Sequence, residues 1–312
     1  MRVAVTGGAG FIGGHVVDAL TDRGHTPIVF DHRGRGDADV MLGDCRDEVA
    51  VTEMAAHVDA IIHLASVLGT QETVANPRPA VLTNVAAGLN VFEAAAQYGL
   101  PVVNISVGNT GHANPYSASK TCVETLGQMF INDRGLRLNQ VRPVNAYGPR
   151  QSVSAPYGSA KVRKIMPSFI CRALTGQPIE VYGDGEQVSD CVYVTDVASV
   201  LVTALESAAQ GNVSAEVIEV GPAAHHTVNE IAELVRAEVS TYTDRLAPIT
   251  HLPMRPGETP GAVVTADTAT LHRVGVDAAE FVGLPLGIAA AVDWFVRHEG
   301  VTWTNPASNA AK

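Results

Sequence analysis

A tyrosine and a lysine four residues apart, Tyr116 and Lys120, are the residues of this chain best suited to acid-base chemistry. The segment from Asn114 to Lys120 opens a helical pattern, and residues four apart lie on one face of a helix. Bringing a phenol from a pKa near 10 to about 7 requires about 4 kcal/mol of preferential phenolate stabilisation, which a nearby ammonium helps to supply. We therefore expect Tyr116 to act as a base with the help of Lys120.

A glycine-rich turn follows the first β-branched run of the chain. The segment from Thr6 to Gly13 reads TGGAGFIG, with glycines at positions 7, 10 and 13, and a helical pattern comes after it. Such a backbone can approach a pyrophosphate closely, and the N-terminus of the following helix can hold it. The motif alone is a weak signal, but the flanking strand and helix favour a dinucleotide site over a turn without a ligand.

An aspartate, Asp31, ends the second expected strand. A carboxylate at this spacing accepts hydrogen bonds from the adenosine ribose hydroxyls, which favours NAD over NADP. Arg33 and Arg35 follow it and could meet a 2′-phosphate, and a solvated turn residue is the other interpretation of Asp31. The positive nicotinamide ring of bound NAD would add to the field that stabilises the Tyr116 phenolate.

The elements that must position these residues alternate between short β-branched runs and longer Ala/Leu-rich segments. This order predicts an α/β fold of the Rossmann type, a doubly wound parallel sheet covered by helices, with ligands at the carboxyl ends of its strands. Runs such as Ile61 to Ala65 are apolar throughout, as expected of strands buried on both faces. The expected strands cover 2–6, 27–31, 60–65 and 102–106, and the expected helices cover 13–23 and 84–98.

A stretch rich in Gly, Pro and Ser from Tyr147 to Lys161 predicts a loop and a domain boundary. We expect residues 1–150 to form the NAD-binding domain, with later segments at about 183–203 returning to it. Residues 151–312 are expected to form mainly a smaller α/β domain for the substrate. Its expected helices cover 165–174, 228–239 and 286–298, and its expected strands cover 179–182 and 217–220.

Composition limits the classes of partner. The 312 residues include 21 Lys and Arg against 32 Asp and Glu, a net charge of −11 that disfavours a nucleic-acid partner. The four cysteines are widely spaced, and no Cys or His cluster has the spacing of a metal site. No apolar stretch reaches the roughly 18 residues that a membrane span requires. We expect a cytoplasmic protein with reduced thiols, no metal and no membrane partner.

With these residues, the chain resembles the extended short-chain dehydrogenase/reductase family, and within it the nucleotide-sugar epimerases and dehydratases. The motifs that carry the resemblance occur in the family's order over nearly the whole chain. They are TGGAGFIG, GDCRD at 43–47, HLAS at 63–66, NV at 84–85, YSASK at 116–120, RPVNAYGP at 142–149, GDGEQVSD at 183–190, YVTDVA at 193–198 and RPGE at 255–258.

The resemblance implies that Tyr116 is the base and that Lys120 activates it and holds the nicotinamide ribose. It also implies that Asp44 and Cys45 lie along the adenine, and that Leu64 and Ala65 line the dinucleotide site. The implied NAD-binding residues are Gly7, Gly10, Phe11, Ile12, Gly13, Asp31, Asp44, Cys45, Leu64, Ala65, Ser66, Asn84, Tyr116, Lys120 and Pro143.

For the nucleotide-diphosphate sugar, the resemblance implies a second set of contacts. Arg255 would face the diphosphate with Glu258 nearby, whereas Met166 and Tyr182 have a simple core position as their alternative. The implied substrate-binding residues are Asn145, Lys164, Met166, Tyr182, Gln187, Ser189, Arg255 and Glu258.

Two departures from the family pattern affect the site. Val107 stands where relatives usually carry a catalytic Ser or Thr, so Ser106 or Thr110 would have to supply that hydroxyl. Ser189 stands where many relatives place an Arg on the diphosphate, a loss that Arg163, Lys164 or Arg255 would partly offset.

The resemblance also bears on the reaction. Relatives that act as 4,6-dehydratases carry an Asp-Glu pair, and decarboxylases a Glu, where this chain has Gly108 and Asn109. Epimerisation at C4 of a UDP-glucose or UDP-galactose type of sugar is therefore favoured, through a transient 4-keto sugar. The alternatives are a 4,6-dehydratase, a UDP-glucuronate decarboxylase or epimerase, and a non-catalytic binding protein. Relatives commonly form homodimers through two helices per subunit, for which the apolar faces of 86–98 and 121–131 are the candidates here. Burial of these faces inside one subunit is the other interpretation.

Overall fold

The computed structural model describes residues 1–34, 39–108, 110, 113–151, 163–256 and 258–298. Seven parallel strands form the main sheet in the order β3-β2-β1-β4-β5-β6-β9. The order reverses between β1 and β4, which marks the switch point at which such sheets bind ligands. In spatial order the strands are β3 (Asp39–Leu42), β2 (Thr26–Asp31), β1 (Arg2–Thr6), β4 (Ala60–His63), β5 (Val102–Ile105), β6 (Leu138–Pro143) and β9 (Ile218–Val220).

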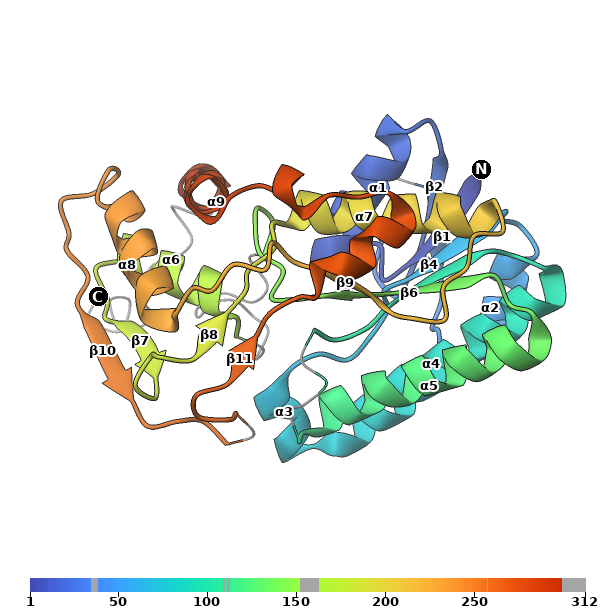
Figure 1. Ribbon diagram of the computed structural model, residues 1–312, viewed down its shortest axis with the longest axis horizontal. Helices are drawn as coiled ribbons and strands as arrows, with labels where there is room; N and C mark the ends of the chain where they lie inside the picture. The colour runs from blue at the N-terminus through green and yellow to red at the C-terminus, as the bar shows by residue number, and fades with distance from the viewer. Residues whose placement is uncertain (35–38, 109, 111–112, 152–162, 257, 299–312) are drawn as a thin grey trace.

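Helices cover both faces of this sheet, which confirms the predicted Rossmann-type fold (Figure 1). On one face lie α1 (Phe11–Asp22) and α7 (Val194–Ala209). On the other lie α2 (Glu48–Ala55), α4 (Pro77–Tyr98) and α5 (Pro115–Arg134), with the short α3 (Thr70–Ala75) beside α4. After residue 183 the chain thus returns to the sheet twice, with α7 on its face and β9 at its edge.

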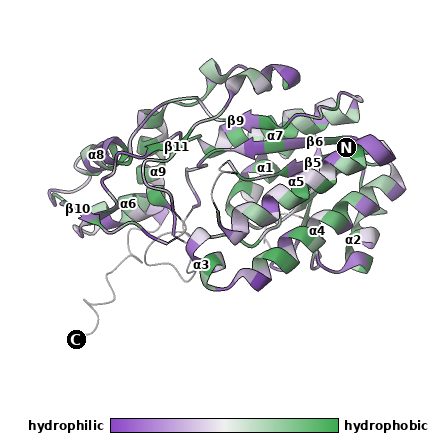
Figure 2. Ribbon diagram, turned by 60° about the horizontal axis from the view of Figure 1, so that its bottom comes forward, coloured by the Kyte–Doolittle hydropathy of each residue, from purple (hydrophilic) through white to green (hydrophobic). Residues whose placement is uncertain are grey.

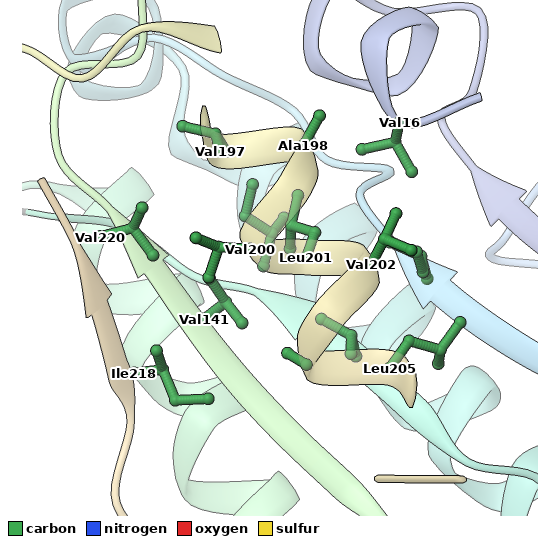
Figure 3. Packing of buried hydrophobic residues seen from close by; sticks show 14 of the residues in the cluster. Val16, Val141, Val197, Ala198, Val200, Leu201, Val202, Leu205, Ile218 and Val220 are labelled. Atoms are coloured by element: carbon green, nitrogen blue, oxygen red, sulfur yellow. The ribbon is translucent and has the colours of Figure 1, made fainter. Parts of the chain in front are cut away.

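Two apolar layers hold the helices to the sheet. Helix α7 presents buried residues such as Val200 and Leu201 to Val141 of β6, and α1 adds Val16 (Figure 3). The opposite face packs α2, α4 and α5 through residues such as Met54 and Phe92. Because both faces are buried, the strands are apolar along most of their length, as the sequence predicts.

The N-terminus of α5 fixes the position of Tyr116. The side chain of Asn114 caps the helix by accepting a hydrogen bond from the backbone N–H of Ser117 at 2.9 Å, and Pro115 takes the first helical position. At the other end the helix stops at Gly135, whose φ of 65° is left-handed. Tyr116 therefore lies in the first turn of the helix that follows β5.

A second, smaller part of the chain has its own apolar core, at the left of Figure 1. Phe169, Ile231 and Val292 are among its buried residues. Its elements are α6 (Ile165–Leu174), β7 (Ile179–Tyr182), α8 (Val228–Val239), β10 (Ile249–Leu252) and α9 (Leu284–His298). The short strands β8 (Val188–Ser189) and β11 (Val263–Val264) form a separate pair. The turns η2 (Thr268–Val274) and η3 (Ala278–Glu280) pack instead against the core of the main sheet, where Leu271 is buried. Strand β7 pairs with β10 and β8 with β11, both in parallel. Among the described helices, none has the length and apolar character needed to cross a bilayer.

Candidate active site

The glycine-rich turn has the backbone that a pyrophosphate site requires. Gly7 has a left-handed φ of 73°, and a methyl group added at Gly13 would lie 2.3 Å from the carbonyl oxygen of Gly7. No side chain caps the N-terminus of α1, whose N-cap is Gly10 and whose first two residues are Phe11 and Ile12. The first N–H groups of this helix are therefore open to an anion.

Asp31 joins the end of β2 to this turn. The backbone N–H of Ala9 donates to one carboxylate oxygen at 3.2 Å, and that of Arg33 donates to the other at 3.1 Å. The side chain is 5% exposed, so it is fixed in place before any ligand binds. Each carboxylate oxygen can accept more than one hydrogen bond, which leaves capacity for ribose hydroxyls.

The segment expected along the adenine lies beyond β3. Asp44 forms an ion pair with Arg46, which holds the pKa of its carboxyl below the usual value. Cys45 is 7% exposed, and burial raises the pKa of its thiol to about 12. Cys45 is therefore a neutral packing residue beneath this segment.

Thr6 fixes the ends of β1 and β4 to each other. Its hydroxyl accepts hydrogen bonds from the backbone N–H groups of Leu64 at 3.2 Å and Ala65 at 3.3 Å, and it lies 2.7 Å from Nδ1 of His63. A methyl group at Gly7 would lie 2.9 Å from the nitrogen of Ala65. The backbone expected to line the dinucleotide site is thus in contact with the glycine-rich turn.

Asn84 is 2% exposed, and its side-chain amide donates hydrogen bonds to two other groups of the protein. Its amide nitrogen donates to Ser119 at 2.9 Å and to the carbonyl of Val67 at 3.2 Å, while its oxygen accepts from the Val67 N–H at 2.7 Å. Asn84 therefore braces the loop that contains Ser66 against α5. Pro143 is likewise buried, at the end of β6.

The structure places Tyr116 half-buried and Lys120 2% exposed, one turn apart on α5. Burial raises the pKa of the Tyr116 phenol to about 12 and lowers the pKa of the Lys120 ammonium to about 8, although Glu124 opposes the second shift. That Lys120 helps to lower the Tyr116 pKa stays a prediction. Because desolvation raises that pKa, the phenolate requires added positive charge in the site.

The end of β5 distinguishes the two candidate hydroxyls. Ser106 is 5% exposed, and its Oγ is buried with no hydrogen-bond partner. Thr110 is exposed. Ser106 is thus the hydroxyl that a ligand at this strand end would satisfy. Asn109 lies outside the described residues.

The backbone around Gly108 leaves no room for a side chain at this position. A methyl group there would lie 2.7 Å from the carbonyl oxygen of Pro143 and 2.8 Å from Cα of Val144. Both contacts are with backbone atoms, which cannot move aside as a flexible side chain can. No side chain fits at Gly108 without moving the end of β6.

Five of the residues expected to bind the sugar nucleotide form three contacts with one another. Asn145 donates to the hydroxyl of Ser189 at 2.8 Å. The guanidinium of Arg255 lies 4.4 Å from the ring centre of Tyr182, whose carbonyl accepts a hydrogen bond from Gln187 at 2.7 Å. Gln187 Oε1 and Arg255 Nε are buried with no partner, so both retain hydrogen-bonding capacity for a ligand.

Arg255 also forms an ion pair with Glu258, and the charges of both act on Lys164. Glu72 of α3 acts on the same lysine. These four charges gather at one place although they come from distant segments of the chain. Glu72 is a residue that the sequence analysis missed, because a six-residue helix gives too weak a periodic signal to be placed.

Met166 lies in a core and Gln71 forms a contact between the two parts of the chain. Met166 is 2% exposed within the apolar core of α6, α8 and α9, so the structure places it at a core position. Gln71 of α3, also missed, donates to the carbonyl of Pro256 at 2.6 Å and so joins the sheet domain to the Arg255 loop.

The geometry of the glycine-rich turn, Asp31 and the Tyr116–Lys120 helix agrees with an independent comparison of sequences. The profile of the NAD dependent epimerase/dehydratase family matches residues 3–221. The chain belongs to this family. This epimerase/dehydratase is therefore an enzyme, and its cofactor is NAD, for which the turn and Asp31 provide a fitting site.

Known proteins that are similar to this chain have several different activities. It is 28% identical to the UDP-N-acetyl-alpha-D-glucosaminuronate decarboxylase of Bacillus cytotoxicus over 81% of this chain and 83% of that protein. It is 30% identical to a putative UDP-glucose 4-epimerase of Methanocaldococcus jannaschii over 76% of this chain and 82% of that one. The crystal structure of Thermus thermophilus UDP-glucose 4-epimerase with NAD superposes with a TM-score of 0.80 and 28% identity, covering 95% and 99% of the two chains.

Proposed function

We propose that this enzyme epimerises a nucleotide-diphosphate sugar at C4, of the UDP-glucose and UDP-galactose type, through a transient 4-keto sugar. The observation that carries this proposal is the closed position at Gly108. Dehydratase relatives are expected to carry there the first residue of an acid-base pair, and water elimination needs such a pair. Epimerisation needs only reversible oxidation at one carbon, for which Tyr116, Lys120 and bound NAD suffice.

The roles of the chain's own residues follow from their positions. Bound NAD supplies the acceptor, and later the donor, of the hydride. Tyr116 takes the proton from the C4 hydroxyl and returns it at the end, while Lys120 stabilises the phenolate. Ser106 holds the reacting oxygen through its buried hydroxyl. Because the ketone at C4 is flat, a sugar that turns within the site exposes its other face for the return of the hydride.

The substrate site is proposed to lie between the sheet edge and the Arg255 loop. Arg255 Nε and Gln187 Oε1 are buried without partners, and Arg255 is already paired with Glu258. An arginine matches the geometry of phosphate oxygens, so the diphosphate would bind Arg255 in partial exchange for Glu258. Lys164 adds a second cation there. Asn145 and Ser189, which contact each other, would lie beside the sugar.

We also propose that the enzyme is a homodimer formed through α4 and α5. Figure 2 shows hydrophobic residues along both helices. Leu82 of α4 is 55% exposed and Met129 of α5 is 52% exposed, in addition to Val81 at 44%. Exposed apolar residues on this helix pair favour association with another apolar surface.

The direct test is incubation of the purified protein with UDP-glucose and UDP-galactose, and in parallel with their N-acetyl and uronic acid forms. We expect one C4 pair to interconvert, with products separated by anion-exchange chromatography and identified by NMR. A 4-keto-6-deoxy product would instead establish a dehydratase, and loss of carbon dioxide from a uronic acid would establish a decarboxylase. If no pair is interconverted, the epimerase proposal is wrong.

A further inference from the structure

One hydrogen bond joins the loop that contains Arg255 to the main sheet and its helices. Gln71 of α3 lies 2.6 Å from the carbonyl oxygen of Pro256, 185 residues later in the chain. A carbonyl can only accept, so the amide nitrogen of Gln71 is the donor. Among the described residues between β10 and β11, Pro256 is the one with a hydrogen bond to this part of the protein. Figure 1 shows α3 beside this loop.

The segment that precedes α3 is tied to α4 and α5. Asn84 of α4 accepts a hydrogen bond from the N–H of Val67 at 2.7 Å and donates one to the carbonyl of Val67 at 3.2 Å. Asn84 also donates to the hydroxyl of Ser119 at 2.9 Å, and that hydroxyl donates to the carbonyl of Tyr116 at 2.8 Å. Helix α3 follows this segment directly. Gln71 therefore extends from a segment that is fixed to the turn of α5 that carries Tyr116.

The side chain of Arg255 has two neighbours, and neither belongs to the main sheet or its helices. Its guanidinium lies 4.4 Å from the ring centre of Tyr182 in β7 and forms an ion pair with Glu258 of the same loop. Its backbone is restricted by the next residue, because a residue before proline is confined to extended conformations and the ring of Pro256 fixes its own φ. A hydrogen bond to the Pro256 carbonyl therefore limits how this stiff segment, and Arg255 with it, can turn.

We propose that Gln71 is a positioning residue, which holds Arg255 in place for the diphosphate of the substrate through its bond to the Pro256 carbonyl. Arg255 Nε is buried without a partner, so the guanidinium has a donor to offer a phosphate oxygen. A phosphate bound there lies against the Arg255 loop, whereas the sugar must reach Tyr116 on α5. The bond between Gln71 and Pro256 holds these two points in register. The inference rests on the proposed function, because it takes a nucleoside diphosphate as the ligand of Arg255.

The alternative role of this bond is to connect two parts of the protein and nothing more. A purely structural bond predicts that its loss lowers stability, whereas a positioning role predicts weaker binding of a diphosphate by a protein that stays folded. The bond between Gln71 and Pro256 lies at an exposed position, where a substitution usually costs the fold little. Stability and diphosphate binding can therefore be measured separately in the same variant.

The experiment uses the full-length, NAD-bound protein with UDP as the probe and dTDP in parallel. Gln71→Met preserves the length of the side chain and removes its donor. Gln128→Met is the matched control, since Gln128 donates a hydrogen bond of the same kind, to Asn132 at 3.2 Å, but within α5 alone. Dissociation constants are measured by calorimetry, and KM and kcat are measured with the sugar nucleotide that the wild type converts.

A neutral hydrogen bond corresponds to a change of about fivefold in an equilibrium constant. We expect Gln71→Met to bind UDP more weakly by that factor and to raise KM similarly, with kcat, NAD content and the unfolding midpoint unchanged. Gln128→Met should match the wild type throughout. Added to Arg255→Gln, Gln71→Met should not change the UDP dissociation constant further, because the residue that Gln71 positions is gone.

Unchanged UDP affinity in folded Gln71→Met overturns the proposal, and so does an equal loss of affinity when Arg255 has already been replaced. If Gln71→Met does not fold, Gln71→Ala decides, because it also lacks the donor and unchanged affinity there overturns the proposal equally. A wild type that binds UDP but converts no sugar contradicts the proposed function and leaves this result intact. A wild type that binds neither nucleotide overturns the inference as well.

Discussion

At the scale of single residues, burial shifts the pKa values of the two members of the reactive pair, Tyr116 and Lys120, in opposite directions. It favours the neutral forms of both, so the phenol of Tyr116 becomes less acidic while the ammonium of Lys120 loses its proton more easily. A base that operates at neutral pH is therefore not complete in the protein alone. In the proposed mechanism the positive nicotinamide ring of bound NAD would supply the missing charge, which would couple proton removal to the presence of oxidised cofactor.

Replacing Tyr116 by Phe tests this residue directly. General base catalysis contributes about 10²–10⁴-fold, and we expect turnover to fall by that factor in Tyr116→Phe. The variant should retain its NAD, measured by mass spectrometry of the small molecules released on denaturation. Tyr98→Phe, at a position 43% exposed, is the control and should keep full turnover. Full activity in Tyr116→Phe would assign the base elsewhere.

The lowered pKa of His63 leads to a prediction about stability in acid. Its pKa is lowered to about 3 in the folded state, so below the ordinary value of about 6.5 the unfolded chain binds a proton that the folded chain does not. Stability is therefore lost as the pH falls from 6.5 towards 3. Between pH 7 and pH 5 this residue should cost about 2 kcal/mol of unfolding free energy.

The measurement is urea unfolding at the two pH values for the wild type and His63→Gln. The variant should lose about 2 kcal/mol less than the wild type on acidification, whatever its stability at pH 7. Equal losses in the two proteins would show that His63 is not held neutral.

At the scale of elements, the glycine-rich turn depends on the absence of one side chain. A methyl group at Gly13 would overlap the carbonyl of Gly7, so Gly13→Ala must displace the turn or α1. We expect the variant to purify without NAD while retaining its helical content by circular dichroism. Gly283→Ala, where nothing lies within 4 Å, is the matched control and should retain NAD. Cofactor retained in Gly13→Ala would contradict the site.

The sequence predicts the long elements well because their periodic patterns are strong. The first strand, α6, β7 and α8 have the bounds that were expected. Helix α4 begins at Pro77, seven residues before the expected start at position 84, because two prolines in its first turn resemble a helix stop although that turn tolerates proline. Strands β3, β8, β10 and β11 have at most four residues and lack a distinct pattern.

The sequence predicts the candidate site less evenly. Tyr116 and Gly13 lie in local motifs, so spacing alone identifies them. Gln71 and Glu72 belong to no such motif, and their proximity to the Arg255 loop depends on how distant segments of the chain meet. Met166 could not be assigned from the sequence, because a core residue and a residue lining the substrate site have the same composition.

At the scale of the whole molecule, α3 connects the two parts on which the proposed site depends. Gln71 binds the carbonyl of Pro256, and Glu72 acts on Lys164 near Arg255. The residues that handle the proton belong to the main sheet and its helices, whereas those proposed for the diphosphate belong to the smaller part. Binding of a sugar nucleotide at the proposed site would therefore engage both parts of the chain at once.

The proposed dimer is tested on α4. Leu82→Glu places a charge on the surface proposed to be buried between two copies, and we expect a monomer by analytical ultracentrifugation. Leu246→Glu is the control, since Leu246 is 72% exposed and lies far from α4 in the chain, and it should leave the dimer intact. A wild type that sediments as a monomer would contradict the dimer proposal without affecting the catalytic one.

The central claim is that one carbon is oxidised and reduced again by the same cofactor, with Tyr116 moving the proton. The most direct measurement is NMR of the product formed from UDP-galactose carrying deuterium at C4, for the wild type and for Tyr116→Phe. The account predicts UDP-glucose that retains deuterium at C4 from the wild type, and almost none from the variant. Loss of the deuterium to solvent, deuterium found at C6, or equal conversion by the variant would contradict it.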